Sequence, residues 1–244
     1  KSVNNQPDNL QYYKKNHRDY LNGQVIPNLL LMVTIKEIPS LDATAPDKCK
    51  AILATEETHP LAYLNWKEQF PYHPQVAFQI AHNGKDLFIR FIVDEETAAA
   101  RMTESNSKVC TDSCVEFFLS LDNTGYYNFE FSCIGVMMLG FRQSRIQAEY
   151  ATEEIISSIK RYASLGSTNF EETSMTAPWE LLVVIPASAL FKHHLDSWKG
   201  VTAKGNFYKC GDKLTKPHYI TFAPIATEKP DYHRPEFFVE LRME

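Results

Sequence analysis

The sequence predicts an all-β fold in which antiparallel sheets pack as a sandwich, with a few short peripheral helices. Strand-like segments with alternating apolar residues follow one another from residue 76 to the end of the chain. Prolines between them are typical of turns and edge strands, and no βαβ alternation indicates a parallel sheet. The segments are VAFQIA at 76, DLFIRFIVD at 86, a hairpin over 112–133, VMMLGF at 136, WELLVVIP at 179, GNFYKC at 205, HYITFAPI at 218 and EFFVELRM at 236.

One domain is expected to hold most of the 244 residues, because sandwiches of this size often stay undivided. We place it at residues 32–244 and interpret residues 1–31 as an N-terminal appendage. Apolar residues at helical spacing predict a short helix over 8–23 in this appendage. A similar pattern over 151–163 predicts a helical insertion between strands.

Composition excludes several classes of protein. Hydrophobic residues make up 44% and aromatic residues 12% of the chain, enough for a substantial core. With a net charge of -5 and no basic run longer than Lys14-Lys15, neither nucleic acid nor anionic lipid is an expected partner. No apolar run approaches the ~20 residues of a membrane helix, so no membrane span is expected.

The five cysteines are an odd number, so at least one is unpaired within the chain. A bond between Cys114 and Cys133 is not expected, because the two fall on different faces of the predicted hairpin. Cys110 and Cys114 have no second nearby pair, and their spacing does not indicate a zinc site.

The hairpin DSCVEFFLSLDNTGYYNFEFSC, residues 112–133, carries two strands that each have one apolar face. Glu116, Asn128 and Glu130 lie on the other, mixed face, among aromatic residues. The apolar sets are Val115, Phe117, Leu119 and Leu121 in the first strand and Tyr127, Phe129, Phe131 and Cys133 in the second.

A loop over residues 122–126 would pair Leu121 with Tyr127 and keep both apolar sets on one side. Glu116 would then lie opposite Ser132, and the two glutamates would be diagonal neighbours roughly 7 Å apart at the backbone.

Arg90 is the third candidate charge at this site. Alternation in DLFIRFIVD places Leu87, Ile89, Phe91 and Val93 in the core and leaves Arg90 on the second face. We therefore expect Arg90 to reach the glutamate pair. A face with Arg, Glu, Asn, Ser and Phe suits a hydroxyl-rich ligand, because charged and amide groups bond hydroxyls while rings stack on sugar C–H groups.

Four segments of the chain, within about residues 34–244, together resemble the family 9 carbohydrate-binding modules, specifically the stand-alone family 9-like proteins. The resemblance implies an immunoglobulin-like β-sandwich that recognises a mono- or oligosaccharide without catalysis. The most specific parts are the strand entry at Asp112, Ser113 and Glu116 and the closing strand at Pro235–Phe238. The segments are DSCVEFFLSLD, YYNFEFSCIG, GNFYKCGD and PDYHRPEFFVEL.

In xylanase-attached members of that family, two tryptophan rings hold the sugar and a glutamate of the Asp-Ser-x-Glu strand bonds its hydroxyls. Glu116 matches this glutamate. Glu130 and Ser132 stand where those modules have arginine and asparagine. The first tryptophan position is taken by Val109 or Cys110.

The second tryptophan position falls near Tyr232 or His233. The planar side chains of Tyr232, His233 and Arg234 suit sugar stacking and hydrogen bonding, so these three are candidate ligand-binding residues, although a buried tyrosine and a strand-entry arginine fit the pattern equally well. No cofactor is required for this function. Related modules bind calcium, which makes a structural calcium ion a candidate. The aspartates near expected loops are Asp112, Asp122, Asp212 and Asp231.

Three alternatives stay open at this point. Glu116 and Glu130 can form a solvated or salt-bridged face, or act as the acid and base or nucleophile of a glycosidase. The fold can also serve as an interaction module that has lost sugar binding. Trp66 and Trp198 are further candidate stacking platforms.

The resemblance favours a secreted or periplasmic protein that associates with glycoside hydrolases in polysaccharide degradation. A segment removed upstream of Lys1, such as a signal peptide or a tag, fits that expectation. The alternative is a cytoplasmic protein, favoured by the odd cysteine count and by Met32 as a natural start.

Overall fold

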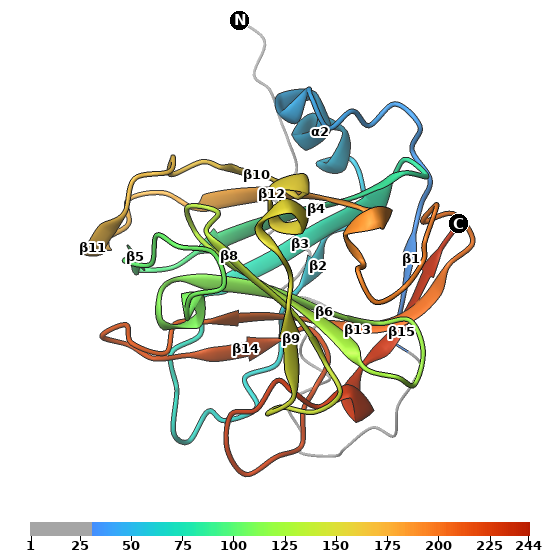
Figure 1. Cartoon of the computed structure of the whole chain (residues 1–244). Helices are drawn as coiled ribbons and strands as arrows, with labels where there is room; N and C mark the ends of the chain where they lie inside the picture. Colours follow the sequence, from blue (N-terminus) through green and yellow to red (C-terminus); the bar gives the residue numbers. More distant parts are fainter. Residues whose placement is uncertain (1–30) are drawn as a thin grey trace, which may run out of the picture. The chain divides into compact units, whose positions relative to one another are not determined.

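The computed structural model describes residues 31–244, in which two main sheets pack face to face (Figure 1). The larger sheet has the order β1-β15-β13-β6-β7-β8-β9, with β14 paired to β13, and the smaller has the order β10-β12-β4-β3-β2. The β1–β15 pair is parallel, whereas the other strand pairs are antiparallel. A separate pair, β5 and β11, lies outside both sheets.

The strands are β1 (Met32–Ile35), β2 (His59–Pro60), β3 (Gln75–His82), β4 (Asp86–Asp94), β5 (Thr97–Ala100), β6 (Cys114–Ser120), β7 (Tyr126–Ser132), β8 (Met137–Arg142), β9 (Ala148–Tyr150), β10 (Lys160–Ala163), β11 (Phe170–Ser174), β12 (Trp179–Pro186), β13 (Thr202–Cys210), β14 (Tyr219–Thr221) and β15 (Val239–Met243). The helices are α2 (Pro46–Leu53), α3 (Glu153–Ser158) and the 3₁₀ turns η2 (Val109–Thr111), η3 (Ala187–Ala189) and η4 (Pro235–Phe237).

The core between the sheets contains the alternating residues that the sequence predicts. Phe117 of β6 and Phe91 of β4 are fully buried there, together with the other members of their alternating sets except Leu121, which is only partly buried. Phe207 stacks on Phe78 of the facing sheet, with ring centroids 3.7 Å apart, and on its neighbour Phe117 at 4.7 Å. The predicted β-sandwich is therefore confirmed.

A second apolar layer covers the outer face of the larger sheet. Phe118, Tyr126 and Tyr208 point away from the core, yet all three are buried. Residues from connecting segments pack over them, notably Trp66 and Tyr232. The β6–β8 and β13 part of this sheet is consequently buried on both faces.

The β6–β7 register differs from the expected one by two residues. Leu119, and not Leu121, pairs with Tyr127, so Glu116 lies directly opposite Glu130. Leu121 lies in the turn and not in the strand, because the turn begins directly after Ser120. The Ser120 hydroxyl donates to the carbonyl oxygens of Asp122 and Gly125 within this turn. A shift by two keeps each side chain on its predicted face.

The helix predicted over 151–163 is correct only in its first half. Thr152 caps α3, with its side-chain oxygen accepting from the backbone N–H of Ile155. The chain then extends into β10, where Lys160–Ala163 pairs with β12. Pairing with the sheet outweighs the helical spacing there.

Three further predictions concern a terminal helix, membrane spans and the cysteines. The helix predicted over 8–23 lies outside the described residues. Within residues 31–244, no helix is both long and apolar enough to cross a membrane. All five cysteines belong to this part of the chain, and each is a free thiol.

Candidate functional site

Two carboxyl groups lie side by side on the outer face of the larger sheet. Glu116 of β6 and Glu130 of β7 are cross-strand neighbours with only 3% and 4% of their surfaces exposed. Asn128 Nδ2 donates to Glu130 Oε1 at 2.9 Å, and Arg142 Nε donates to Asn128 Oδ1 at 2.8 Å. Glu130 Oε2 has no hydrogen-bond partner among residues 31–244. We call the outer surface around these two glutamates the carboxylate face.

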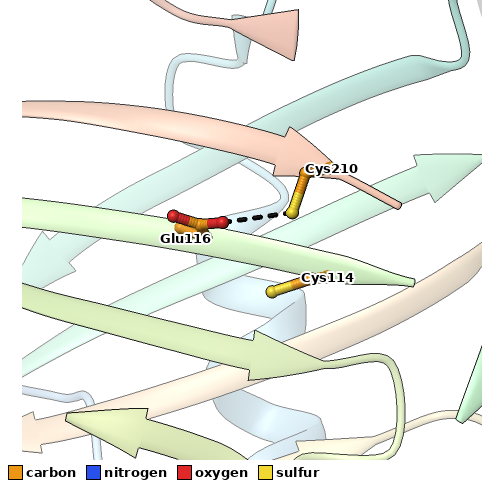
Figure 2. A group of neighbouring side chains, drawn as sticks. All are labelled: Cys114, Glu116 and Cys210. Carbon is orange, nitrogen blue, oxygen red and sulfur yellow. Dashed lines mark hydrogen bonds between the residues drawn. The ribbon is translucent and has the colours of Figure 1, made fainter. Parts of the chain in front are cut away.

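Two thiols complete this cluster. Cys210 of β13 is the register partner of Cys114 of β6, and its Sγ lies 3.1 Å from Glu116 Oε1 (Figure 2). One ligand atom from each of Cys114, Glu116 and Cys210 falls within 4.8 Å of the other two. The sheet register therefore brings together residues that are far apart in the sequence.

Burial governs the protonation of this cluster. Burial, and secondly the charge of Glu130, raises the pKa of Glu116 well above its ordinary value. Burial also raises the pKa of Glu130 to about 7 and that of the Cys114 thiol to about 12. The apolar surroundings thus favour the neutral, protonated forms.

Anchored aromatic side chains cover the carboxylate face. Tyr232 stacks on Tyr208 with ring centroids 4.1 Å apart, and its hydroxyl donates to the Lys209 carbonyl at 2.9 Å. Trp66 Nε1 donates to the Thr227 carbonyl at 2.9 Å. A sugar could contact the glutamates only if this cover moved.

Arg90 does not belong to this face, so the expectation that it reaches the glutamate pair is wrong. It lies on β4 of the smaller sheet, where its guanidinium donates to both carboxylate oxygens of Glu180, at 3.0 and 2.6 Å, and to Gln79. Arg90 does project from the non-core face of β4, as predicted, but this is the outer face of the smaller sheet, whereas the glutamates lie on the outer face of the larger sheet. Arg142 of β8 is the arginine near the glutamates, and the alternation of Met138, Gly140 and Arg142 is the signal that could have found it.

The other predicted residues are distributed over the cover and the surface. Tyr232 and His233 belong to the cover, where His233 Nδ1 lies 3.0 Å from the Tyr126 hydroxyl. Arg234 points elsewhere and pairs with Asp231 at 2.7 Å. Trp66 and Trp198 are 4% and 0% exposed, so neither is available as a stacking platform.

The four aspartates considered for calcium each have other partners. Asp112 accepts from the backbone N–H groups of Arg101 and Met102. The other three are engaged separately: Asp122 with Thr124 and His193, Asp212 with Tyr219, and Asp231 with Arg145 and Arg234. A calcium ion stays a prediction.

A buried ion pair, not anticipated from the sequence, lies on the core side of β13. Lys209 Nζ is 2.9 Å from Glu95 Oε2 and 2.7 Å from His218 Nε2, and all three side chains are fully buried. Trp179 Nε1 donates to the other Glu95 oxygen at 2.8 Å. Burial, and secondly the charge of Lys209, lowers the pKa of His218 to about 2.

An open groove of about 440 Å³ lies where the carboxylate face ends at the β6–β7 turn. Ser120 and Tyr126 connect it to that face, since they alternate with Glu116 and Asn128 on the same side of their strands. The lining residues are Ser120, Leu121, Asp122, Asn123, Thr124, Gly125, Tyr126, Gln143, Thr202, Ala203, Lys204, Pro235, Phe238 and Glu240. A second groove, of about 220 Å³, is lined by Thr97, Glu172, Thr173, Ser174, Thr215 and Lys216.

A two-sheet sandwich with a polar cluster on one face and a polar groove at its rim defines the class of β-sandwich binding modules. The model of the carbohydrate-binding family 9 matches residues 48–243, and the chain belongs to this family of non-catalytic sugar-binding modules. The predicted family is thus confirmed.

Solved structures agree with this assignment. A Bacteroides uniformis protein, provisionally described as carbohydrate-binding, is 37% identical, with a TM-score of 0.82 over 87% of this chain and 99% of its own. Family 9 modules from Caldicellulosiruptor kristjanssonii in complex with cellotriose and with glucose have TM-scores of 0.54, identities of 10% and 11%, and cover 87% of this chain and 93% and 95% of their own. At such identities they show the shared fold alone. A search of curated protein sequences gives no match.

Proposed function

We propose that this family 9 protein binds a mono- or oligosaccharide, without chemical conversion, in the groove beside the β6–β7 turn. The observation that carries the proposal is an open groove of about 440 Å³ with both polar and apolar walls, which falls in the size range of small-molecule sites, about 300–1,000 Å³. Glu116, the glutamate that matches the family pattern, lies beneath the aromatic cover and does not line this groove.

The groove has the chemistry that sugar recognition needs. The side chains of Lys204 and Gln143 have no hydrogen-bond or ion-pair partner within residues 31–244, so their ammonium and amide groups are free to bond hydroxyls. Asp122 and Glu240 add carboxylate acceptors, and Phe238 adds an apolar wall for sugar C–H groups.

The relatives suggest which sugars to test first. Because family 9 modules of Caldicellulosiruptor kristjanssonii are known with cellotriose and glucose, we propose β-glucans and their fragments as the first ligand class. A glycoside hydrolase as partner is a further proposal, since binding modules of this kind raise the local concentration of an enzyme on its polymer.

Isothermal titration of the full chain with glucose, cellobiose and cellotriose tests the proposal. We expect saturable binding by the wild-type protein and at least about tenfold weaker binding by the double variant Lys204→Ala/Gln143→Ala. Two lost hydrogen bonds, one from a charged donor, account for a change of this size.

Two matched variants locate the site. Lys216→Ala removes a lysine from the smaller groove and should leave the affinity unchanged. Glu116→Gln probes the carboxylate face. If Glu116→Gln abolishes binding while the double variant binds normally, the sugar binds at the carboxylate face and not in the groove. If the folded wild-type protein binds no sugar of a wider glycan panel, the proposed function is wrong.

A further inference from the structure

We propose that Cys114, Glu116 and Cys210 form a zinc site, with Glu130 as the fourth ligand. The three donor atoms already lie within 4.8 Å of one another, on the neighbouring strands β6 and β13 (Figure 2). The site is independent of the proposed sugar groove, because none of the four residues lines that groove.

The strand pairing fixes the positions of these donors. Cys114 and Cys210 are register partners on the same face, and Glu116 follows Cys114 by two residues and so projects from that face as well. Zinc binds thiolate sulfur at about 2.3 Å and carboxylate oxygen at about 2.0–2.2 Å, so ligand atoms of a tetrahedral site are roughly 3.5 Å apart. Cys210 Sγ and Glu116 Oε1 are 3.1 Å apart, close to this spacing, and the Cys114 ligand atom lies within 4.8 Å of both.

The buried carboxyl group of Glu130 gives a separate argument for a metal ion at this place. Its Oε2 is buried and has no hydrogen-bond partner among residues 31–244. The carboxyl group lies directly across from Glu116, and its charge acts on both Glu116 and the Cys110 thiol, which places it at the cluster. An unpaired buried oxygen costs free energy in the folded state, whereas a metal ion would satisfy it.

The acids and thiols of the cluster can ionise only if a cation replaces their protons. Three carboxyl groups and three thiols gather here, and two described cations that act on them are already engaged. Arg142 is bonded to Asn128 and to the Arg145 carbonyl, and Lys209 to the Cys210 carbonyl and to Glu95. Two thiolates among the donors favour zinc over calcium or magnesium, which prefer oxygen ligands alone. The acids and thiols are Glu116, Glu130, Asp212, Cys110, Cys114 and Cys210.

Cys110 indicates a route for the ion. It is the one partly exposed cysteine among the five, and it borders the buried cluster, with its backbone carbonyl 3.6 Å from Cys210 Sγ. We therefore infer that zinc enters beside Cys110, at the partly exposed edge of the cluster.

Metal analysis of the full chain tests the proposal. The protein is stripped with a chelator under reducing conditions, given Zn²⁺, dialysed and analysed for metal. We expect one zinc per chain, a higher midpoint of thermal unfolding with zinc than after chelation, and, with Co²⁺ in place of zinc, a thiolate-to-cobalt charge-transfer band.

Conservative variants separate ligation from folding. Cys210→Ser and Glu130→Gln keep the size and polarity of each side chain, and we expect zinc affinity to fall at least about 100-fold in the first and about tenfold in the second. Cys49→Ala removes a buried thiol elsewhere, on α2, and should bind zinc as the wild type does.

Three results would overturn the proposal. The first is wild-type protein that retains no zinc, which would show that the acids and thiols of the cluster are simply protonated and bind no metal. The second is equal zinc binding by folded Cys210→Ser. The third is a disulfide between Cys114 and Cys210, found in unreduced and denatured protein as three free thiols in place of five and assigned to this pair by peptide mapping.

Discussion

Replacing Lys209 by methionine is expected to lower the free energy of unfolding by about 3–5 kcal/mol, because it leaves the Glu95 carboxylate buried without its cation. Both side chains have no exposed surface, so water cannot replace the lost partner. The measurement is urea-induced unfolding followed by the fluorescence of the three tryptophans, one of which, Trp179, is bonded to Glu95.

A second substitution and an exposed control make this test specific. The double variant Lys209→Met/Glu95→Gln should recover much of the loss, because the glutamine carries no charge and still accepts from Trp179. Lys199→Met removes one partner of an exposed ion pair with Glu37 and should cost no more than about 1 kcal/mol. A single variant at Lys209 as stable as the wild type would contradict our account of this pair.

The stability of the protein is expected to fall as the pH falls below about 6.5, in part because of His218. In the tautomer that satisfies both of its contacts, Nδ1 donates to the Lys216 carbonyl and Nε2 accepts from the Lys209 ammonium. Burial and Lys209 lower the pKa of His218 to about 2. Between pH 6.5 and 2 the unfolded chain therefore binds a proton that the folded chain does not, which removes about 1.4 kcal/mol per pH unit.

The variant His218→Gln isolates this contribution. Glutamine can make both hydrogen bonds but cannot take up the proton, so its unfolding free energy should decline less steeply between pH 6.5 and 4. The surrounding titratable groups, Glu95, Lys209, His73 and Tyr72, are the same in both proteins. His194→Gln, at an exposed histidine, should behave as the wild type does. If the unfolding free energy declines equally steeply with falling pH in His218→Gln and in the wild type, the pKa of His218 is not lowered in the folded protein.

The strands and their faces could be predicted from the sequence because both follow from local alternation. Phe117 and Phe91 occupy the core as the period of two predicts. The register of the β6–β7 hairpin could not be obtained in the same way, since hydrogen bonds of Ser120 within the turn decide it. The end of α3 likewise depends on the distant strand β12.

The candidate site was harder to predict because it depends on contacts between distant segments. Alternation places Glu116, Asn128 and Glu130 on one face correctly, yet it cannot show that Trp66 and Tyr232 bury that face. Cysteine spacing fails for a related reason. Cys114 and Cys210 are brought together by the β6–β13 pairing, so the distance between them along the chain carries no signal.

A further source of error is the sheet to which each strand belongs. Alternation correctly places Arg90 on the face of its strand that points away from the core. That strand, however, belongs to the smaller sheet. The partner of Arg90 is Glu180, which comes from β12 and follows Arg90 by ninety residues. Only the order of strands within each sheet distinguishes Arg90 from Arg142, and strand order is not a local property.

The aromatic cover also determines where the ligand preference of this protein can change over evolution. Substitutions on the covered face alter packed side chains, so most of them would reduce folding stability before they changed what is bound. The β6–β7 turn has exposed positions, such as Asn123, whose replacement affects little beyond the groove. New sugar preferences in such proteins should therefore arise from variation in this turn, while the sheet beneath it keeps the constraints of a protein interior.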